Sequence, residues 1–303
     1  MNVTEHLERR VLTVSVWGAG IFSAGAITFG LVAGSQFLLF DGLYSLISVV
    51  ASLMSLMASK FMAQDDWERF PFGKLAIEPL VVAVKYVMIL IVIVGSAASS
   101  LISLFTGGRP IVLGIAVGYS FISTLACWAV AHYIHRQSDD SNLLRAEEGQ
   151  WRMDAWISGV ALAAFVGALG LKYVPGSAAI LPYLDPIMVL AGSVYFVRVP
   201  LHEIGCALRE LLDMAPDALL QAKVQQAVTH IEQSYGFQES YLRMSSVSRQ
   251  LWIEVDFVVQ PSTSMSTVAD GDKIREDLSQ RLKGVKGDQW LTVCFTTDRK
   301  WAQ

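Results

Sequence analysis

Oxygen-bearing side chains recur on two long apolar stretches of this chain. In the first stretch they are Asp41, Tyr44, Ser45 and Ser48, at i, i+3, i+4 and i+7; in the second they are Gln150, Asp154 and Ser158, at four-residue steps. Such spacings align side chains along one side of an α-helix. Carboxylate, phenol, hydroxyl and amide oxygens that converge from two helices could together bind a cation.

An interhelical hydrogen bond is the ordinary alternative for the neutral members of these two stripes, because hydroxyl and amide groups often join helices within a membrane. Both interpretations stay open for Tyr44, Ser45, Ser48 and Ser158. The carboxylates favour the cation-binding interpretation, since an ionisable group at membrane depth is costly and usually marks a functional site.

Six apolar stretches are each long enough to cross a bilayer, which takes roughly 20 mainly apolar residues. They are about 11–33, 37–63, 77–105, 111–135, 148–171 and 183–204, and Asp185-Pro186 is expected to start the last helix. The chain is 53% hydrophobic and only 17% charged, whereas soluble domains carry about 25% charged residues. We therefore predict an all-α bundle of six transmembrane helices over residues 1–208, with the lipid bilayer as its partner.

Basic residues favour one side of the predicted bundle. They lie before the first span (Arg9, Arg10) and in the loops after the second and fourth spans (Lys60, Arg69, Lys74, Arg136, Arg145). By the positive-inside rule both termini are predicted to be cytoplasmic. The short loops suggest a multi-pass protein of a bacterial inner membrane.

The sequence pattern changes after residue 208. Helical patterns at 216–234 and 267–283 alternate with β-rich runs at 239–246, at 250–260 and at the closing WLTVCFTT. The order αββαβ predicts a ferredoxin-like α+β domain over residues 209–303.

Several function classes lack support in the sequence. A net charge of −4 gives no reason to expect nucleic acid as a partner. No P-loop, nucleophile elbow or HExxH motif is present, so neither an enzyme nor a bound cofactor is expected. Without a nucleotide site, transport would have to be driven by an ion gradient.

Five segments, taken in their order and spacing, resemble the cation diffusion facilitator family of metal efflux transporters. They are LLFDGLYSLISVVASL, RFPFGKLAIEPL, AEEGQWRMDAWISGVAL, LDPIMVLAGS and ELLDMAPD. The resemblance covers nearly the whole chain. It implies a transport site of two residues four apart on the second span and two on the fifth, which fall here on Tyr44, Ser48, Gln150 and Asp154. Only Asp154 keeps the family's usual Asp or His identity, and Asp41 matches an acidic residue found one turn earlier.

The donors at these positions are all hard oxygens. Such donors suit Na⁺, Mg²⁺, Ca²⁺ or Mn²⁺ better than Zn²⁺. Asp154 alone would balance a monovalent ion, whereas Asp154 with an ionised Asp41 could balance a divalent one. Lys85 in the third span could decide between them, and we expect it to pair with Asp41. The sequence therefore favours Na⁺ export, with a divalent metal (Mn²⁺, Mg²⁺, Fe²⁺ or Zn²⁺) as the alternative.

The resemblance also implies a homodimer that exchanges a cytoplasmic cation for a proton by alternating access. The family's accessory histidine positions read Phe70, Lys74, Ser240, Val255 and Thr296 here, which leaves only Asp298 as a ligand. We therefore expect no C-terminal metal site and a tail that serves dimerisation. A regulatory membrane subunit that no longer transports is the alternative from another class, and the retained Asp41 and Asp154 argue against it.

Overall fold

The structure, a computed structural model, describes residues 3–64, 66, 68–136, 142–248, 250–285 and 287–302, except for the side chains of residues 3–12, 142–147 and 178. Arg9, Arg10 and Arg145, on which the predicted orientation partly rests, lie outside the described side chains. The chain divides into two compact units, one of Met1–Leu56 with Val84–His202 and the other of Met57–Ala83 with Glu203–Gln303. The domain boundary at 208/209 stays a prediction.

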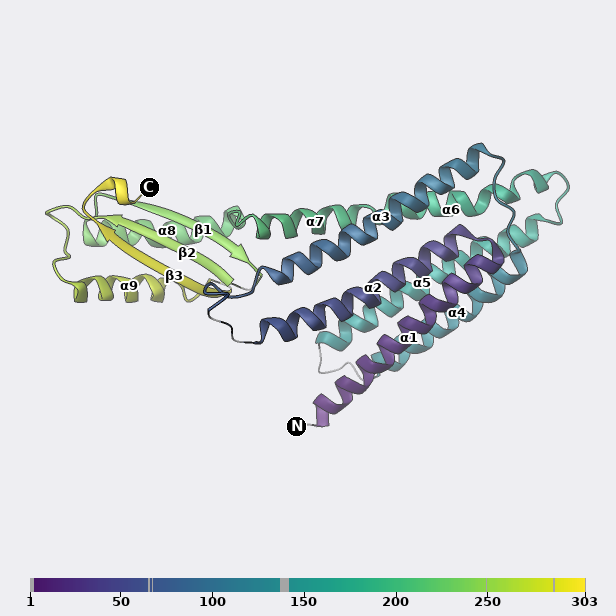
Figure 1. Cartoon of the computed structure of the whole chain (residues 1–303), viewed down its shortest axis with the longest axis horizontal. Helices are drawn as coiled ribbons and strands as arrows, with labels where there is room; N and C mark the ends of the chain where they lie inside the picture. The colour runs from purple at the N-terminus through teal and green to yellow at the C-terminus, as the bar shows by residue number, and fades with distance from the viewer. Residues whose placement is uncertain are drawn as a thin grey trace. The chain divides into compact units, whose positions relative to one another are not determined.

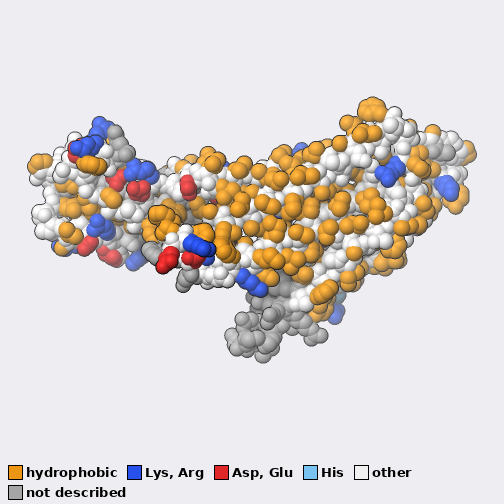
Figure 2. Space-filling view, in the orientation of Figure 1, with side chains coloured by type: hydrophobic (Ala, Val, Ile, Leu, Met, Phe, Trp, Pro, Cys, Tyr) orange, Lys and Arg blue, Asp and Glu red, His pale blue; other side chains and the backbone are white. Residues whose placement is uncertain are grey.

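Long helices make up the first part of the chain (Figure 1). They are α1 (Val3–Ala33), α2 (Gln36–Met62), α3 (Ile77–Phe105), α4 (Leu113–His135), α5 (Asn142–Leu171), α6 (Leu181–Phe196) and α7 (Arg198–Leu211), with a short 3₁₀ turn η1 (Ser177–Ala179) before α6. Six segments of the described chain are long and apolar enough to cross a membrane, so the predicted bundle is confirmed. Hydrophobic side chains cover most of the visible surface of these helices (Figure 2), as a surface in contact with lipid requires.

The last membrane segment is longer than predicted and consists of two helices. It runs over Leu181–Leu211, whereas the sequence predicted 183–204. Helix α6 begins at Leu181, four residues before Asp185, and ends at Phe196. Pro200 explains the break before α7, because it has no N–H to donate to the carbonyl of Phe196.

The start of α2 is held by a carboxylate from α6. The side chain of Asp185 is fully buried. It accepts hydrogen bonds from Ser35 Oγ at 2.5 Å, from the Gln36 amide at 2.7 Å and from the Phe37 amide at 3.3 Å. The first amides of a helix have no partner within the helix and carry its positive dipole end. Asp185 therefore satisfies them and ties α2 to α6.

The loop between α3 and α4 also contacts α6, through its first turn. Pro186 has no N–H, which leaves the Pro182 carbonyl free within the helix, and the Arg109 amide donates to that carbonyl at 2.8 Å. Gly108 lies against the same turn with φ at 82°, and a Cβ at this position would come within 2.6 Å of Pro182 Cβ. Only glycine fits this contact.

Helices α1 and α2 approach closely near the middle of the bundle. A Cβ on Gly42 would lie 2.8 Å from the Ile27 amide nitrogen, and Ser23 Oγ donates to the Gly42 carbonyl at 2.9 Å. Small residues allow membrane helices to pack at short range. This contact fixes the face that α2 presents two residues later, at Tyr44.

The C-terminal part of the chain forms a small α+β domain. It contains α8 (Ala218–Tyr235), β1 (Glu239–Val247), β2 (Gln250–Val258), α9 (Val268–Leu282), β3 (Asp288–Thr296) and a 3₁₀ turn η2 (Arg299–Trp301). The sheet has the order β1-β2-β3, antiparallel between β1 and β2 and parallel between β2 and β3. A parallel pair needs a crossover, which α9 supplies. The predicted order αββαβ is confirmed.

The two helices of this domain cover one face of its sheet. Val228 of α8 and Ile274 of α9 join Val255 and Phe257 of β2 in one fully buried cluster. Helix α9 starts with a capping box in which Thr267 and Asp270 each accept from the other's backbone amide. Val255, at which the resemblance implied an accessory metal position, is thus a core residue here.

Candidate cation site

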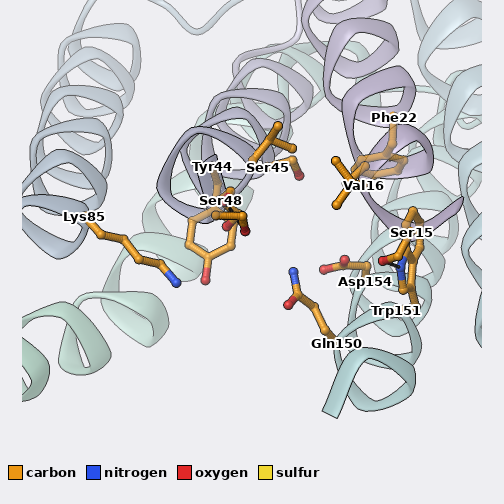
Figure 3. Close-up of a pocket in the computed structure, with 13 residues that line it drawn as sticks. Ser15, Val16, Phe22, Tyr44, Ser45, Ser48, Lys85, Gln150, Trp151 and Asp154 are labelled. Carbon is orange, nitrogen blue, oxygen red and sulfur yellow. Dashed lines mark hydrogen bonds between the residues drawn. The ribbon is translucent and has the colours of Figure 1, made fainter. Parts of the chain in front are cut away.

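The two oxygen-bearing stripes meet at one cavity of about 90 Å³ inside the first unit. That is room for several water-sized bodies. Its walls come from α1 (Ser15, Val16, Ala19, Phe22), α2 (Tyr44, Ser45, Ser48, Val49, Ser52), α3 (Lys85) and α5 (Gln150, Trp151, Asp154). Figure 3 shows the Asp154 and Gln150 side chains directed from α5 toward the side chains of α2.

Most of the residues singled out from the sequence border this cavity. They are Tyr44, Ser45, Ser48, Lys85, Gln150 and Asp154. Ser158 is turned elsewhere, since its hydroxyl lies 2.8 Å from that of Ser123 on α4 in a buried hydrogen bond. For Ser158 the structure therefore shows the interhelical bond that was the alternative interpretation.

Asp41 is not among the residues that line the cavity. It lies on α2 one helical turn before Tyr44, and its carboxylate is near enough to Asp154 for the two charges to interact. Asp41 can therefore influence a bound ion through its charge. Its predicted pairing with Lys85 stays a prediction.

The contribution of α1 to the wall of the cavity was not predicted. The Trp151 indole nitrogen donates to Ser15 Oγ at 2.7 Å, in a buried contact between α5 and α1. Trp151 stands next to Gln150 and one turn before Asp154, so this bond fixes the rotation of α5 at the cavity. Trp151 was not singled out from the sequence, because periodicity along a helix gives no indication of which neighbouring helix a residue meets.

A second hollow of about 550 Å³ adjoins the site on the side of α3 and α6. Tyr44, Ser48, Lys85, Gln150 and Asp154 border both spaces. Phe196 at the end of α6 contributes to the second wall, with its ring centroid 5.8 Å from that of Tyr44. These five side chains thus lie between the two spaces and border both of them.

The donors at the cavity are chemically uniform. They comprise one carboxylate, an amide, a phenol and several hydroxyls, with one amine beside them. Over the ranges that the structure describes, no three His, Cys, Asp or Glu side chains gather closely enough to share a metal ion. Oxygen donors of these kinds, charged and neutral, are the ligands that hard cations bind.

Lys74, at which the resemblance implied a histidine position, lies in the loop between α2 and α3. It is 8% exposed. Its ammonium donates to the Phe61 carbonyl at 3.2 Å and the Gln64 carbonyl at 2.8 Å, and lies 4.3 Å from the Phe61 ring centroid. A cation at the carbonyl end of a helix is favourable. An amine of this chain thus neutralises the end of α2.

Comparison with known proteins agrees with this architecture. The family model described as the cation efflux transmembrane domain matches residues 12–212. The chain is also 24% identical over 248 residues to magnetosome protein MamM of Magnetospirillum gryphiswaldense, an alignment that covers 78% of this chain and 72% of that protein. The range that the family model matches contains every residue that lines the cavity. The chain belongs to the cation diffusion facilitator family of cation efflux transporters, as the resemblance predicted.

Proposed function

We propose that this transporter exports a hard monovalent cation, Na⁺ in the first place, in exchange for protons. The observation that carries the proposal is the cavity at which Asp154 meets the neutral oxygens of Tyr44, Ser48 and Gln150. Neutral oxygens replace the hydration shell of an ion without adding charge. A site with few negative charges and no soft ligand favours a weakly charged, hard cation.

Proton exchange follows from the same carboxylate. A carboxyl group can hold either a cation, when it is ionised, or a proton. If the site faces the two sides of the membrane in turn, Asp154 releases the cation on one side when a proton takes its place. One group then couples two opposed fluxes, and a proton gradient drives export.

The family supports a homodimer, and we propose that the C-terminal domain serves as its dimerisation element. We place the protein in a bacterial inner membrane with both termini in the cytoplasm, following the distribution of basic residues. A divalent cation is the second candidate. The observation that favours it is the proximity of Asp41 to Asp154, because two ionised carboxylates balance a divalent charge.

A flux panel on purified protein in liposomes tests the proposal. Uptake of Na⁺, K⁺, Mg²⁺, Mn²⁺ and Zn²⁺ would be measured with an imposed pH gradient, for the wild type and for Asp154→Asn. We expect Na⁺ uptake coupled to proton release, reduced about 100-fold in Asp154→Asn because a buried ion loses the carboxylate that borders the cavity.

The matched control is Asp272→Asn, which removes an exposed carboxylate on α9 that pairs with Arg275. It should transport like the wild type. Zinc uptake that persists at the wild-type rate in Asp154→Asn would overturn the assignment. Absence of both flux and any cation-dependent shift in melting temperature would favour the regulatory subunit instead.

A further inference from the structure

The charges around the cavity can be counted from the described side chains. Of the groups that border the two hollows, Lys85, Arg152 and Asp154 are ordinarily charged, and Tyr44 and Tyr86 are neutral phenols. The Arg152 guanidinium lies at the exposed edge, 3.4 Å from the Glu148 carboxylate, so this pair adds no net charge. Asp41, which lies on α2 one helical turn before Tyr44, adds a second carboxylate beside the site.

When both carboxylates are ionised around a bound cation, two carboxylates and one ammonium leave a single net negative charge at the site. In a medium of low dielectric constant an uncompensated charge is costly, so the best-held ion is the one whose charge cancels that of its surroundings. With Lys85 present that ion is monovalent. Without the ammonium, Asp41 and Asp154 would match a divalent ion.

The position of Lys85 suits a permanent role at this site. It lies on α3 and borders both hollows together with Asp154. Figure 3 shows its side chain extending from α3 toward Tyr44 at the cavity. Its amine is also 5.2 Å from the ring centroid of Tyr86, within the range in which a cation is attracted to an aromatic face. The neighbouring ring thus helps to hold the amine end of Lys85 beside the cavity.

We propose that Lys85 is the residue that sets the valence of the transported ion. Its ammonium balances one of the two carboxylate charges. Only one negative charge is then left for the transported ion, so the site selects monovalent cations. The inference rests on the proposed function and sharpens it, since Asp154 remains the ligand and the proton carrier. Lys85 contributes charge, and its aliphatic chain contributes only packing.

Charge-exchange variants test this role. The ratio of Na⁺ to Mn²⁺ affinity would be measured twice, as flux in liposomes and as the cation-dependent rise in melting temperature in detergent. We expect Lys85→Met to shift the ratio toward Mn²⁺ by about tenfold or more, on the scale of a lost charge compensation. Lys85→Arg should keep the wild-type ratio. Lys85→Met combined with Asp41→Asn should restore the preference for Na⁺, because one negative charge again remains.

The melting temperature without added cation reports whether each variant folds, and Lys85→Gln serves as a second neutral variant. An unchanged ratio in both neutral variants overturns the proposal, as does a Lys85→Arg variant that behaves like Lys85→Met. Failure of the proposed function looks different, because the wild type would then respond to no cation by either measurement, and both proposals would fall together.

Discussion

At the scale of single residues, the site combines one directly placed carboxylate with several neutral oxygens. Ser48 borders both hollows, and its backbone carbonyl accepts from Ser52 Oγ at 3.0 Å. The carbonyl therefore already has a partner besides the backbone of its own helix, and the hydroxyl is the oxygen of Ser48 that we expect to bind an ion. Loss of a neutral oxygen should cost far less than loss of Asp154, since a neutral hydrogen-bonding group contributes about 1 kcal/mol.

Ser48→Ala should therefore weaken Na⁺ binding about 5- to 10-fold and leave the maximal rate of transport nearly unchanged. The measurement is the concentration of Na⁺ that gives half-maximal flux in liposomes. The control is Ser103→Ala, because the Ser103 hydroxyl donates to the carbonyl of Ser99 within its own helix and does not border the cavity. Equal half-maximal concentrations in the two variants would contradict a ligand role for Ser48.

The sequence allowed one wall of the site to be predicted better than the other. Tyr44, Ser48 and Asp154 could be found because four-residue steps on apolar helices are visible in the sequence. Ser15 and Trp151 could not, because helical periodicity tells which side of a helix is distinct but not which neighbour it meets. Only the fold brings α1 to that side of α5.

At the scale of elements, the position of α2 depends on a bond from outside the helix. The Asp185 carboxylate accepts from a hydroxyl and two amides at the start of α2. The partners Gln36 and Asp185 are 149 residues apart. The same helix carries Tyr44 and Ser48 two and three turns further on, so Asp185 acts on the site through helix placement.

Asp185→Ala should lower the free energy of unfolding by about 2–4 kcal/mol, because buried donors lose their acceptor. Asp185→Asn should lose less, since its amide oxygen still accepts a hydrogen bond. Denaturant titration of the full chain in detergent measures both changes. An Ala variant as stable as the wild type would show that Asp185 does not hold α2, and Asp272→Ala, which removes an exposed carboxylate, provides the baseline.

Element boundaries followed from the sequence wherever the signal was local. The predicted strand at 239–246 is β1, Glu239–Val247, and the predicted helix at 267–283 is α9, Val268–Leu282. The break between α6 and α7 was missed although Pro200 marks it, because apolar periodicity continues across it. The cap that Asp185 places on α2 could not be predicted, because it joins segments far apart in the chain.

At the scale of the whole molecule, the helical part of the chain and its C-terminal domain expose different kinds of side chain. The visible surface of the helical unit is largely hydrophobic, whereas charged side chains gather on the C-terminal domain (Figure 2). Ion pairs and charged caps stabilise this domain, among them the Arg243–Asp256 contact and the Asp270 cap. Lowering the pH should therefore destabilise the C-terminal domain by protonating its surface carboxylates.

The pKa of Asp270 predicts the direction of this acid effect and the pH range in which it occurs. Hydrogen bonds from the Thr267 side chain, and then from the Ser266 and Thr267 amides, lower the pKa of Asp270 to about 2. A pKa that is lower in the folded state means that the ionised carboxylate stabilises folding at every pH above about 4. That contribution is lost as the pH falls from about 4 to about 2. We expect the protection of α9 amide hydrogens in the full-length protein, measured as the exchange rate relative to the intrinsic rate at each pH, to fall over this range. In Asp270→Asn the exchange should already be faster at neutral pH and should depend less on acid. A variant with the wild-type pH profile would show that the capping box does not hold α9.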